Sequence, residues 1–232
     1  MDFVAGEILV FDKPLTWTSF DVVNKVRFVL CKHLGVKKLK VGHAGTLDPL
    51  ATGVVVVCTG KKTKQIDEFL AQDKEYIAEL ELGATTPSFD LETEIDERYP
   101  YEHISKELLG EKIKLFVGNI KQVPPTFSAV KVDGVRAYKM ARKGKDVEIK
   151  AKDLFIKKIE VLDFSLPKCT LRIVCSKGTY IRALARDIGE ALGSGAHLTA
   201  LHRTRSGEFM IDGALDIQEF AARYPSQIKK EI

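Results

Sequence analysis

The chain has 232 residues, of which 45% are hydrophobic and 29% are charged, and its net charge is +4. This composition is typical of a globular protein with a sizeable core, and the pI near 8.7 permits an acidic partner such as RNA without requiring one. No stretch is long enough to span a membrane, and the N-terminus lacks the apolar segment of a signal peptide. The four cysteines lie in apolar segments without metal-ligand spacing, so we expect reduced thiols in a cytoplasmic protein.

The N-terminal part of the chain predicts a strand, a helix and a basic segment. Residues 8–11 form the expected strand, which ends at a D-K-P turn. A helix follows, with Thr18 or Ser19 as its cap, valines at helical spacing on one face, and Gly35 as its stop. The basic run at residues 37–40 is either a solvated face or a place where phosphates dock, and the sequence leaves this choice open.

Residues 42–53 contain three glycines and a proline, which indicates a tight loop. The apolar residues 54–57 follow directly and predict a buried strand. The loop therefore holds one carboxylate, Asp48, next to the core, and the following Pro49 biases Asp48 away from helical geometry. An Asp before Pro is usually only a turn former, so the local pattern leaves a structural role open.

The next segment predicts a helix, a strand, an acidic loop and a second helix. The lysines and the N-terminus of the helix at residues 60–70 are placed to reach phosphates. Residues 74–82 alternate in polarity, so Tyr76 is the first inward-facing residue of a strand, where a tyrosine usually only packs. An acidic loop containing Asp90 follows, and residues 105–117 predict the second helix.

Residues 124–152 are interpreted as an insertion that grips a substrate. The Asp-Gly pair at 133–134 predicts the turn of a β-hairpin, and a short basic helix is expected at about residues 136–144. From Lys131 to Lys152 there are eight cations and three carboxylates, the densest basic block in the chain. That pattern suits a phosphate backbone, and a charged surface hairpin is the alternative.

The last third of the chain predicts two long strands at residues 154–164 and 169–175, followed by a helix at residues 183–192. If the connecting segment is extended, Tyr180 and Arg182 point the same way, because side chains in a strand alternate with a period of two. The remaining expected elements are a strand at residues 197–205 and a short helix from Asp216.

Two strings resemble signatures of the TruB family of pseudouridine synthases. The first is G-H-A-G-T-L-D-P-L-A-T-G at residues 42–53, and the second is S-K-G-T-Y-I-R at residues 176–182. Three weaker matches occur in the same order as in the family: the D-K-P turn, K-E-Y at residues 74–76, and P-P-T-F-S-A-V-K at residues 124–131. The resemblance spans about residues 6–210, which is nearly the whole chain.

The resemblance implies the α+β pseudouridine synthase fold, with a mixed, mostly antiparallel central sheet, flanking helices and a thumb-like insertion at about residues 124–152. We expect a single catalytic domain over residues 1–232 with a short tail at about residues 212–232, and a monomer. Family members commonly continue into a C-terminal PUA-like RNA-binding domain, which we expect this chain to lack. The implied substrate is the T arm of tRNA at uridine 55.

The resemblance also assigns roles to individual residues. Asp48 is the implied catalytic nucleophile, Arg182 its ionic partner and Tyr76 the ring that stacks on the target uracil. A phosphate contact or a helix cap remains the alternative for Arg182, and a phosphate contact remains the alternative for Lys131. The other implied substrate-binding residues are His43, which fills the gap left in the base stack, Tyr180, Leu201, Lys131 and Asp90.

Pseudouridine formation rearranges a glycosidic bond within one nucleotide, so the implied chemistry needs neither a metal nor another cofactor, and we expect none. It needs one ionised carboxylate in a closed pocket, which an arginine can hold in its charged form. The target base must also be flipped out of its stack, at a cost of a few kcal/mol. Two other functions fit parts of the pattern: a non-catalytic tRNA-binding or tRNA-folding module, and a hydrolytic glycosidase, which usually needs two cooperating carboxylates.

Overall fold

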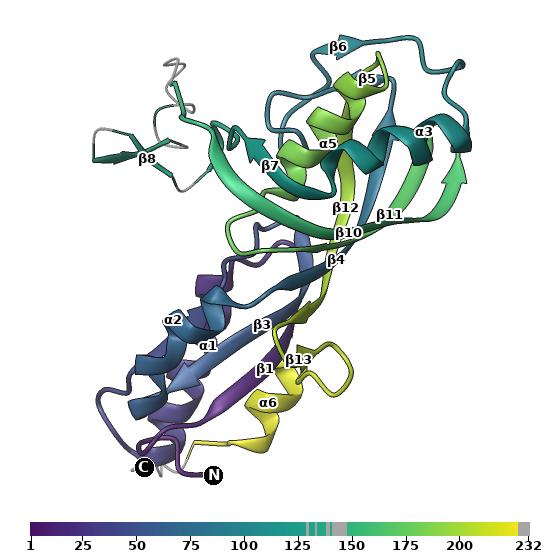
Figure 1. Ribbon diagram of the computed structural model, residues 1–232. Helices are drawn as coiled ribbons and strands as arrows, with labels where there is room; N and C mark the ends of the chain where they lie inside the picture. Colours follow the sequence, from purple (N-terminus) through teal and green to yellow (C-terminus); the bar gives the residue numbers. More distant parts are fainter. Residues whose placement is uncertain (129, 133, 138–139, 141–147, 227–232) are drawn as a thin grey trace. The chain divides into compact units, whose positions relative to one another are not determined.

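The computed structural model of the chain forms two compact units, Met1–Glu75 with His202–Ile232 and Tyr76–Leu201. Two strands, β4 (Lys74–Leu82) and β12 (Ala196–Ser206), contain the points in the sequence where one unit gives way to the other. Among the described residues, no helix is both long and apolar enough to cross a membrane. The structure describes residues 1–128, 130–132, 134–137, 140 and 148–226 (Figure 1).

The first unit is built around β3 (Ala51–Thr59), which is buried along nearly its whole length. Its run of valines explains this, because a strand covered on both faces needs apolar side chains at every position. Antiparallel pairing joins β3 to β1 (Ile8–Lys13) and to β2 (Val41–Ala44). Strand β12 lies on the other side of β3 from β1, and β13 (Phe209–Met210) pairs with β12.

Helices cover both faces of this sheet. On one face, Val54 and Val56 of β3 pack with Phe69 of α2 (Ile66–Ala71), which follows the 3₁₀-helix η1 (Gly60–Gln65). On the other face, Phe11 of β1 meets Phe220 of α6 (Ile217–Arg223) edge-on, with ring centroids 5.1 Å apart. Helix α1 (Ser19–Leu34) packs against α6. The predicted helix at residues 60–70 is therefore only α-helical in its second half.

The ends of α1 follow the predicted signals. The Thr18 hydroxyl accepts a hydrogen bond from the backbone N–H of Asp21, and the Asp21 carboxylate accepts one from the backbone N–H of Thr18. This capping box satisfies two donors at the start of the helix. Gly35 ends the helix in the left-handed conformation at φ 66°, where a residue without a Cβ is not strained.

The second unit contains the strand order β12–β4–β11–β10–β7. Strands β10 (Lys152–Ser165) and β11 (Lys168–Cys175) form an antiparallel hairpin, and β7 (Gly118–Gln122) pairs antiparallel with β10. Strand β4 alternates between buried and half-buried residues, as its sequence predicts. Figure 1 shows α3 (Lys106–Lys112) and α5 (Ile181–Ala191) on the same side of β10 and β11. The 3₁₀-helix η2 (Ile113–Phe116) extends α3.

Two small hairpins complete the described part of this unit. Strands β5 (Ala84–Thr85) and β6 (Glu97–Arg98) pair with each other, as do β8 (Lys131–Val132) and β9 (Val135–Arg136). The second pair confirms the predicted hairpin at the Asp-Gly turn. The basic helix predicted after it, at about residues 136–144, lies mostly outside the described residues.

The structure of this unit adds one strand that the sequence did not indicate and contradicts one expectation. Strand β7 was not anticipated, because G-N-I-K-Q carries no clear alternation and its pairing with β10 supplies the missing preference. The segment before α5 is not extended through Arg182: the helix begins at Ile181, and Tyr180 is its N-cap. The predicted common direction of Tyr180 and Arg182 therefore does not apply, since a period of two holds only in a strand.

Candidate active site

Asp48 lies in the loop that connects two neighbouring antiparallel strands, β2 and β3. A turn closes at this point, where the backbone N–H of Ala51 donates to the carbonyl of Asp48 over 3.1 Å. Next to Asp48, the backbone N–H of Leu47 donates to the hydroxyl of Ser19 over 2.8 Å, and that hydroxyl lies 3.3 Å from the Leu47 carbonyl. The first residue of α1 thus fixes the loop immediately before the carboxylate.

Lys13 holds the loop from the other side. Lys13 is the last residue of β1, and its side chain is fully buried. Its Nζ atom donates to three backbone carbonyls, those of Pro14 (2.9 Å), Pro49 (3.4 Å) and Trp17. Burial lowers the pKa of Lys13 to about 8, while the Asp48 carboxylate opposes this change. A buried ammonium therefore lies within electrostatic reach of Asp48 and is bound to the residue that follows it.

Arg203 of β12 supplies a second buried cation in the same unit. Its Nε atom donates to the Val54 carbonyl over 2.7 Å, and its Nη2 atom donates to the Gly45 carbonyl over 3.0 Å. The guanidinium thus ties Gly45, at the start of the Asp48 loop, to Val54 of β3. Since an arginine stays charged when it is desolvated, it also contributes a fixed positive charge to this region.

His43 lies in β2, half-buried, five residues before Asp48. Burial and, to a smaller extent, the charge of Arg203 lower the pKa of His43 below its ordinary value. The lowered pKa favours the neutral imidazole, which avoids the desolvation cost that a charged ring would carry in this half-buried position.

The close packing of β3 on the backbone of Arg203 constrains Gly53. Gly53 has φ +102°, and a Cβ atom at this position would lie 2.3 Å from the Arg203 carbonyl oxygen. We expect Gly53→Ala to lower the free energy of unfolding by more than about 3 kcal/mol. The backbone of Arg203 must move away from the new Cβ atom, and residue 53 itself must adopt a strained positive φ. Urea denaturation followed by circular dichroism measures this.

Gly35→Ala is the matched control for Gly53→Ala. Gly35 also has a positive φ, +66°, but nothing lies within 4 Å of a Cβ placed there. Its replacement should cost only the left-handed strain, about 1–2 kcal/mol. Equal losses in the two variants would show that contact with the Arg203 backbone does not constrain Gly53 of β3.

The lowered pKa of Lys13 predicts a pH dependence of stability. The folded protein releases this proton near pH 8, whereas the unfolded chain holds it up to the ordinary pKa of 10.5. Between these values the unfolded state binds more protons, so the contribution of Lys13 to stability rises with pH, by about 3 kcal/mol at most.

A comparison of wild type with Lys13→Met isolates this contribution, because all other titrating groups are shared. The difference in the free energy of unfolding should grow in favour of wild type from pH 8 to pH 10, measured in urea at constant ionic strength. A difference that stays constant over this range would contradict the assignment. Lys25→Met, in the middle of α1, is a control for the loss of an ammonium that makes no contact with the Asp48 loop in the described hydrogen bonds.

The second unit holds the arginine of the predicted site in a fixed position. Arg182 is buried in the first turn of α5; its Nη1 atom donates to the Ser88 carbonyl over 3.0 Å and its Nη2 atom to the Phe127 carbonyl over 2.8 Å. Its Nε atom lies 3.5 Å from the carboxylate of Asp90. The structure thus brings Arg182 together with Asp90 within one unit, and the pairing of Arg182 with Asp48 stays a prediction.

Tyr180 is held by a residue that the sequence did not single out. The buried side chain of Gln122, at the end of β7, accepts from the Tyr180 N–H over 2.9 Å and donates to the Tyr180 carbonyl over 3.2 Å. This amide pairs with the backbone as a neighbouring strand would, and it fixes the start of α5. Three residues that position the site were not singled out from the sequence: Gln122, Lys13 and Arg203. Of these, only Lys13 lay in a recognised motif, the D-K-P turn.

The remaining predicted residues belong to the second unit as well. Tyr76 is buried near the start of β4, and Leu201 is half-buried in β12. Lys131 lies in β8, and its side chain lies outside the described residues. The site therefore divides into an Asp48 part with His43 in the first unit and an Arg182 part in the second.

Two family models match the chain, and together they cover residues 32–231. The model of the TruB family pseudouridylate synthase N-terminal domain matches residues 32–181. The chain belongs to the TruB family of pseudouridine synthases. The model described as tRNA pseudouridylate synthase B C-terminal domain matches residues 182–231.

Relatives of this TruB-family chain match it over its full length. It is 62% identical to tRNA pseudouridine synthase B of Phocaeicola vulgatus over 100% of this chain and 99% of that protein. It is 63% identical to tRNA pseudouridine synthase B of Parabacteroides distasonis over 100% of both chains. A crystal structure of a Cbf5-Nop10-Gar1 complex is similar with a TM-score of 0.72 and 30% identity over 96% of this chain, which spans 55% of that one.

These matches confirm the predicted family and its α+β fold with a mostly antiparallel sheet. They also establish the enzyme class, an RNA pseudouridine synthase. The single catalytic domain and the missing PUA-like domain stay predictions, as do the roles of the individual site residues.

Proposed function

We propose that the protein isomerises uridine 55 in the T arm of tRNA to pseudouridine, acting as a monomer with Asp48 as its catalytic carboxylate. The observation that supports this most is the match, at 62% and 63% identity over the whole chain, to proteins named tRNA pseudouridine synthase B. The loop that carries Asp48 adds a physical reason. Three buried side chains, from Ser19, Lys13 and Arg203, hold it in place.

The reaction breaks the N1–C1′ bond of the nucleotide and joins C5 to C1′. The proton that leaves C5 is balanced by one that N1 gains, so no oxidant, phosphate donor or second substrate is consumed. Attack of Asp48 on C1′, attack on C6 of the ring, and removal of a ribose proton are three routes to this product. Each requires one ionised carboxylate in a preorganised position.

The charges of the first unit favour that ionised form. The ammonium of Lys13 lies within electrostatic reach of Asp48, and Arg203 is bound to the start of the same loop and to β3. Opposite charges nearby stabilise a carboxylate against the cost of desolvation. We assign to Arg182 the remaining direct contact with Asp48, and to Asp90 the task of orienting Arg182, from which it lies 3.5 Å away.

The flipped uracil needs apolar walls, and the second unit offers them. Tyr76 stacks on the ring in this proposal, and Tyr180 and Leu201 close the pocket around it. Gln122 keeps Tyr180 at the N-terminus of α5 through two hydrogen bonds. His43 occupies the space that the flipped base leaves, and Lys131 contacts the RNA near the flipped nucleotide. Such contacts offset an unstacking cost of a few kcal/mol.

Incubation with an unmodified tRNA transcript, followed by chemical mapping of pseudouridine, tests the proposal. We expect a single modified position, uridine 55, and no product when that uridine is replaced by cytidine. A non-catalytic tRNA-binding module would bind the transcript and leave it unmodified. Product at another position would retain the enzyme class and overturn the proposed substrate site.

A further inference from the structure

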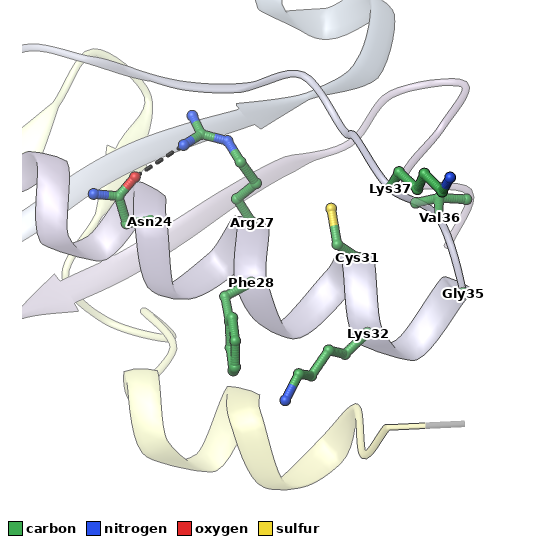
Figure 2. Close-up of a pocket in the computed structure, with 8 residues that line it drawn as sticks. All are labelled: Asn24, Arg27, Phe28, Cys31, Lys32, Gly35, Val36 and Lys37. Carbon is green, nitrogen blue, oxygen red and sulfur yellow. Dashed lines mark hydrogen bonds between the residues drawn. The ribbon is translucent and has the colours of Figure 1, made fainter. Parts of the chain in front are cut away.

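A pocket on the outer side of α1 lies apart from every residue assigned to the active site. Its cavity of about 430 Å³ is formed by the C-terminal half of α1 and the segment that follows it (Figure 2). This volume is within the range of roughly 300–1,000 Å³ that is typical of ligand sites. Apolar groups from Phe28, Cys31 and Val36 share its lining with the cations Arg27, Lys32 and Lys37.

Phe28 is the least expected of these residues. Val26, Val29 and Leu30, its apolar neighbours on α1, are buried, whereas Phe28 is 55% exposed. The Nζ atom of Lys32 lies 4.3 Å from the centroid of this ring. This ammonium lies over one face of the ring, so a single-stranded nucleotide whose base stacks on that face would displace the ammonium, which can then meet the phosphate.

The charge around the pocket points to the same ligand. Residues 24–40 contain six lysines and arginines and no aspartate or glutamate, although the net charge of the whole chain is only +4. The C-terminus of a helix contributes a partial negative charge of about half a unit, which is small against this excess. Arg27 is also fixed, since its guanidinium donates to the Asn24 side chain and to the Val41 carbonyl, each over 2.9 Å.

We propose that this pocket is a second docking site for the RNA substrate, in which an unpaired nucleotide stacks on Phe28 and its neighbouring phosphates contact Lys32 and Lys37. The inference rests on the proposed RNA substrate. It also gives a function to Lys37, the first residue of the basic run at residues 37–40. Both sites are within reach of one RNA: Ser19 at the start of α1 contacts Leu47 beside Asp48, and Lys32 is about 20 Å further along the helix axis.

Substitutions test the pocket through RNA affinity. Phe28→Ala should weaken binding of an unmodified tRNA transcript about tenfold without changing its salt dependence, because stacking involves no counterion. The double variant Lys32→Gln, Lys37→Gln should reduce the slope of log affinity against log salt by about 1.5, the value for two lost phosphate contacts.

Two controls accompany these variants. Phe155→Ala removes an exposed ring from β10, and Lys106→Gln removes an exposed lysine from α3. Both should bind tRNA like wild type. If the pocket variants match these controls in affinity and in salt slope, the docking site is refuted. If they weaken binding while wild type forms no pseudouridine, the docking site stands and the proposed reaction falls.

Cys31 gives an independent, local readout in the unmodified protein. It is a free, half-buried thiol in the pocket, whereas Cys58 and Cys169 are buried, and burial raises their pKa values to about 11 and about 12. Saturating tRNA should slow alkylation of Cys31 at least about fivefold, and Cys58 and Cys169 serve as internal references. An unchanged alkylation rate of Cys31 in the RNA complex would overturn the proposal. If polyglutamate slows alkylation of Cys31 and tRNA does not, the proposal is also overturned, and the pocket would bind an acidic protein instead.

Discussion

Asp48→Asn is expected to abolish pseudouridine formation while leaving tRNA affinity within about twofold of wild type. The substitution keeps the size of the side chain and removes the charge that each route to the product requires. A loss of at least about 10⁴-fold in turnover is of the order found when a catalytic group is removed from an enzyme. Single-turnover assays with excess enzyme measure it, because they separate chemistry from RNA binding.

Asp12→Asn is the matched control for this variant. Asp12 is an exposed residue of β1 whose charge raises the pKa of Lys13. Replacing Asp12 with Asn removes one negative charge from the same unit, as Asp48→Asn does. We expect near wild-type turnover. If Asp48→Asn retains more than a few per cent of wild-type turnover, or if both variants lose activity equally, Asp48 is not the catalytic carboxylate.

Elements whose signals are local were predictable from the sequence. Helix α1 carries its own cap in Thr18 and Asp21 and its own stop in Gly35, so nothing distant is needed to define it. Strand β4 alternates in burial because its polarity alternates in sequence. The Asp48 loop was recognisable for a different reason: its twelve-residue motif resembles that of a known family, and the glycine pattern alone indicated only a turn.

Features that depend on contacts between distant residues were not predictable. Arg203 lies about 150 positions from the loop it binds, and Gln122 is 58 positions from Tyr180. In the sequence each is one polar residue in an ordinary segment, and only the pairing of strands and helices gives it a buried partner. The same holds for the start of α5, where the sequence did not indicate that the helix begins before Arg182.

Arg182→Lys is expected to lower turnover by about 100-fold or more. The guanidinium donates to the carbonyls of Ser88 and Phe127 from two nitrogens and presents a third to Asp90. An ammonium carries its three donors on one atom and cannot reach all these acceptors, so the charge moves away from its place in the site. Displacements of about 1 Å cost on the order of 100-fold in rate. Arg186→Lys, on the same helix and paired with Asp187, is the control and should change turnover less than about threefold.

A thermodynamic cycle then tests whether Arg182 and Asp48 interact directly. We expect the unfolding free energies of wild type, Asp48→Asn, Arg182→Lys and the double variant to give a coupling energy of about 1–3 kcal/mol, as residues in contact do. A second cycle with Asp90→Asn in place of Asp48→Asn gives a reference coupling energy for a known contact, because the Asp90 carboxylate lies 3.5 Å from the Nε atom of Arg182. Coupling to Asp90 without coupling to Asp48 would mean that the guanidinium serves only to fasten the loop of Ser88 to α5. The nearby positive charge that the Asp48 carboxylate needs would then come from cations other than Arg182, such as Lys13.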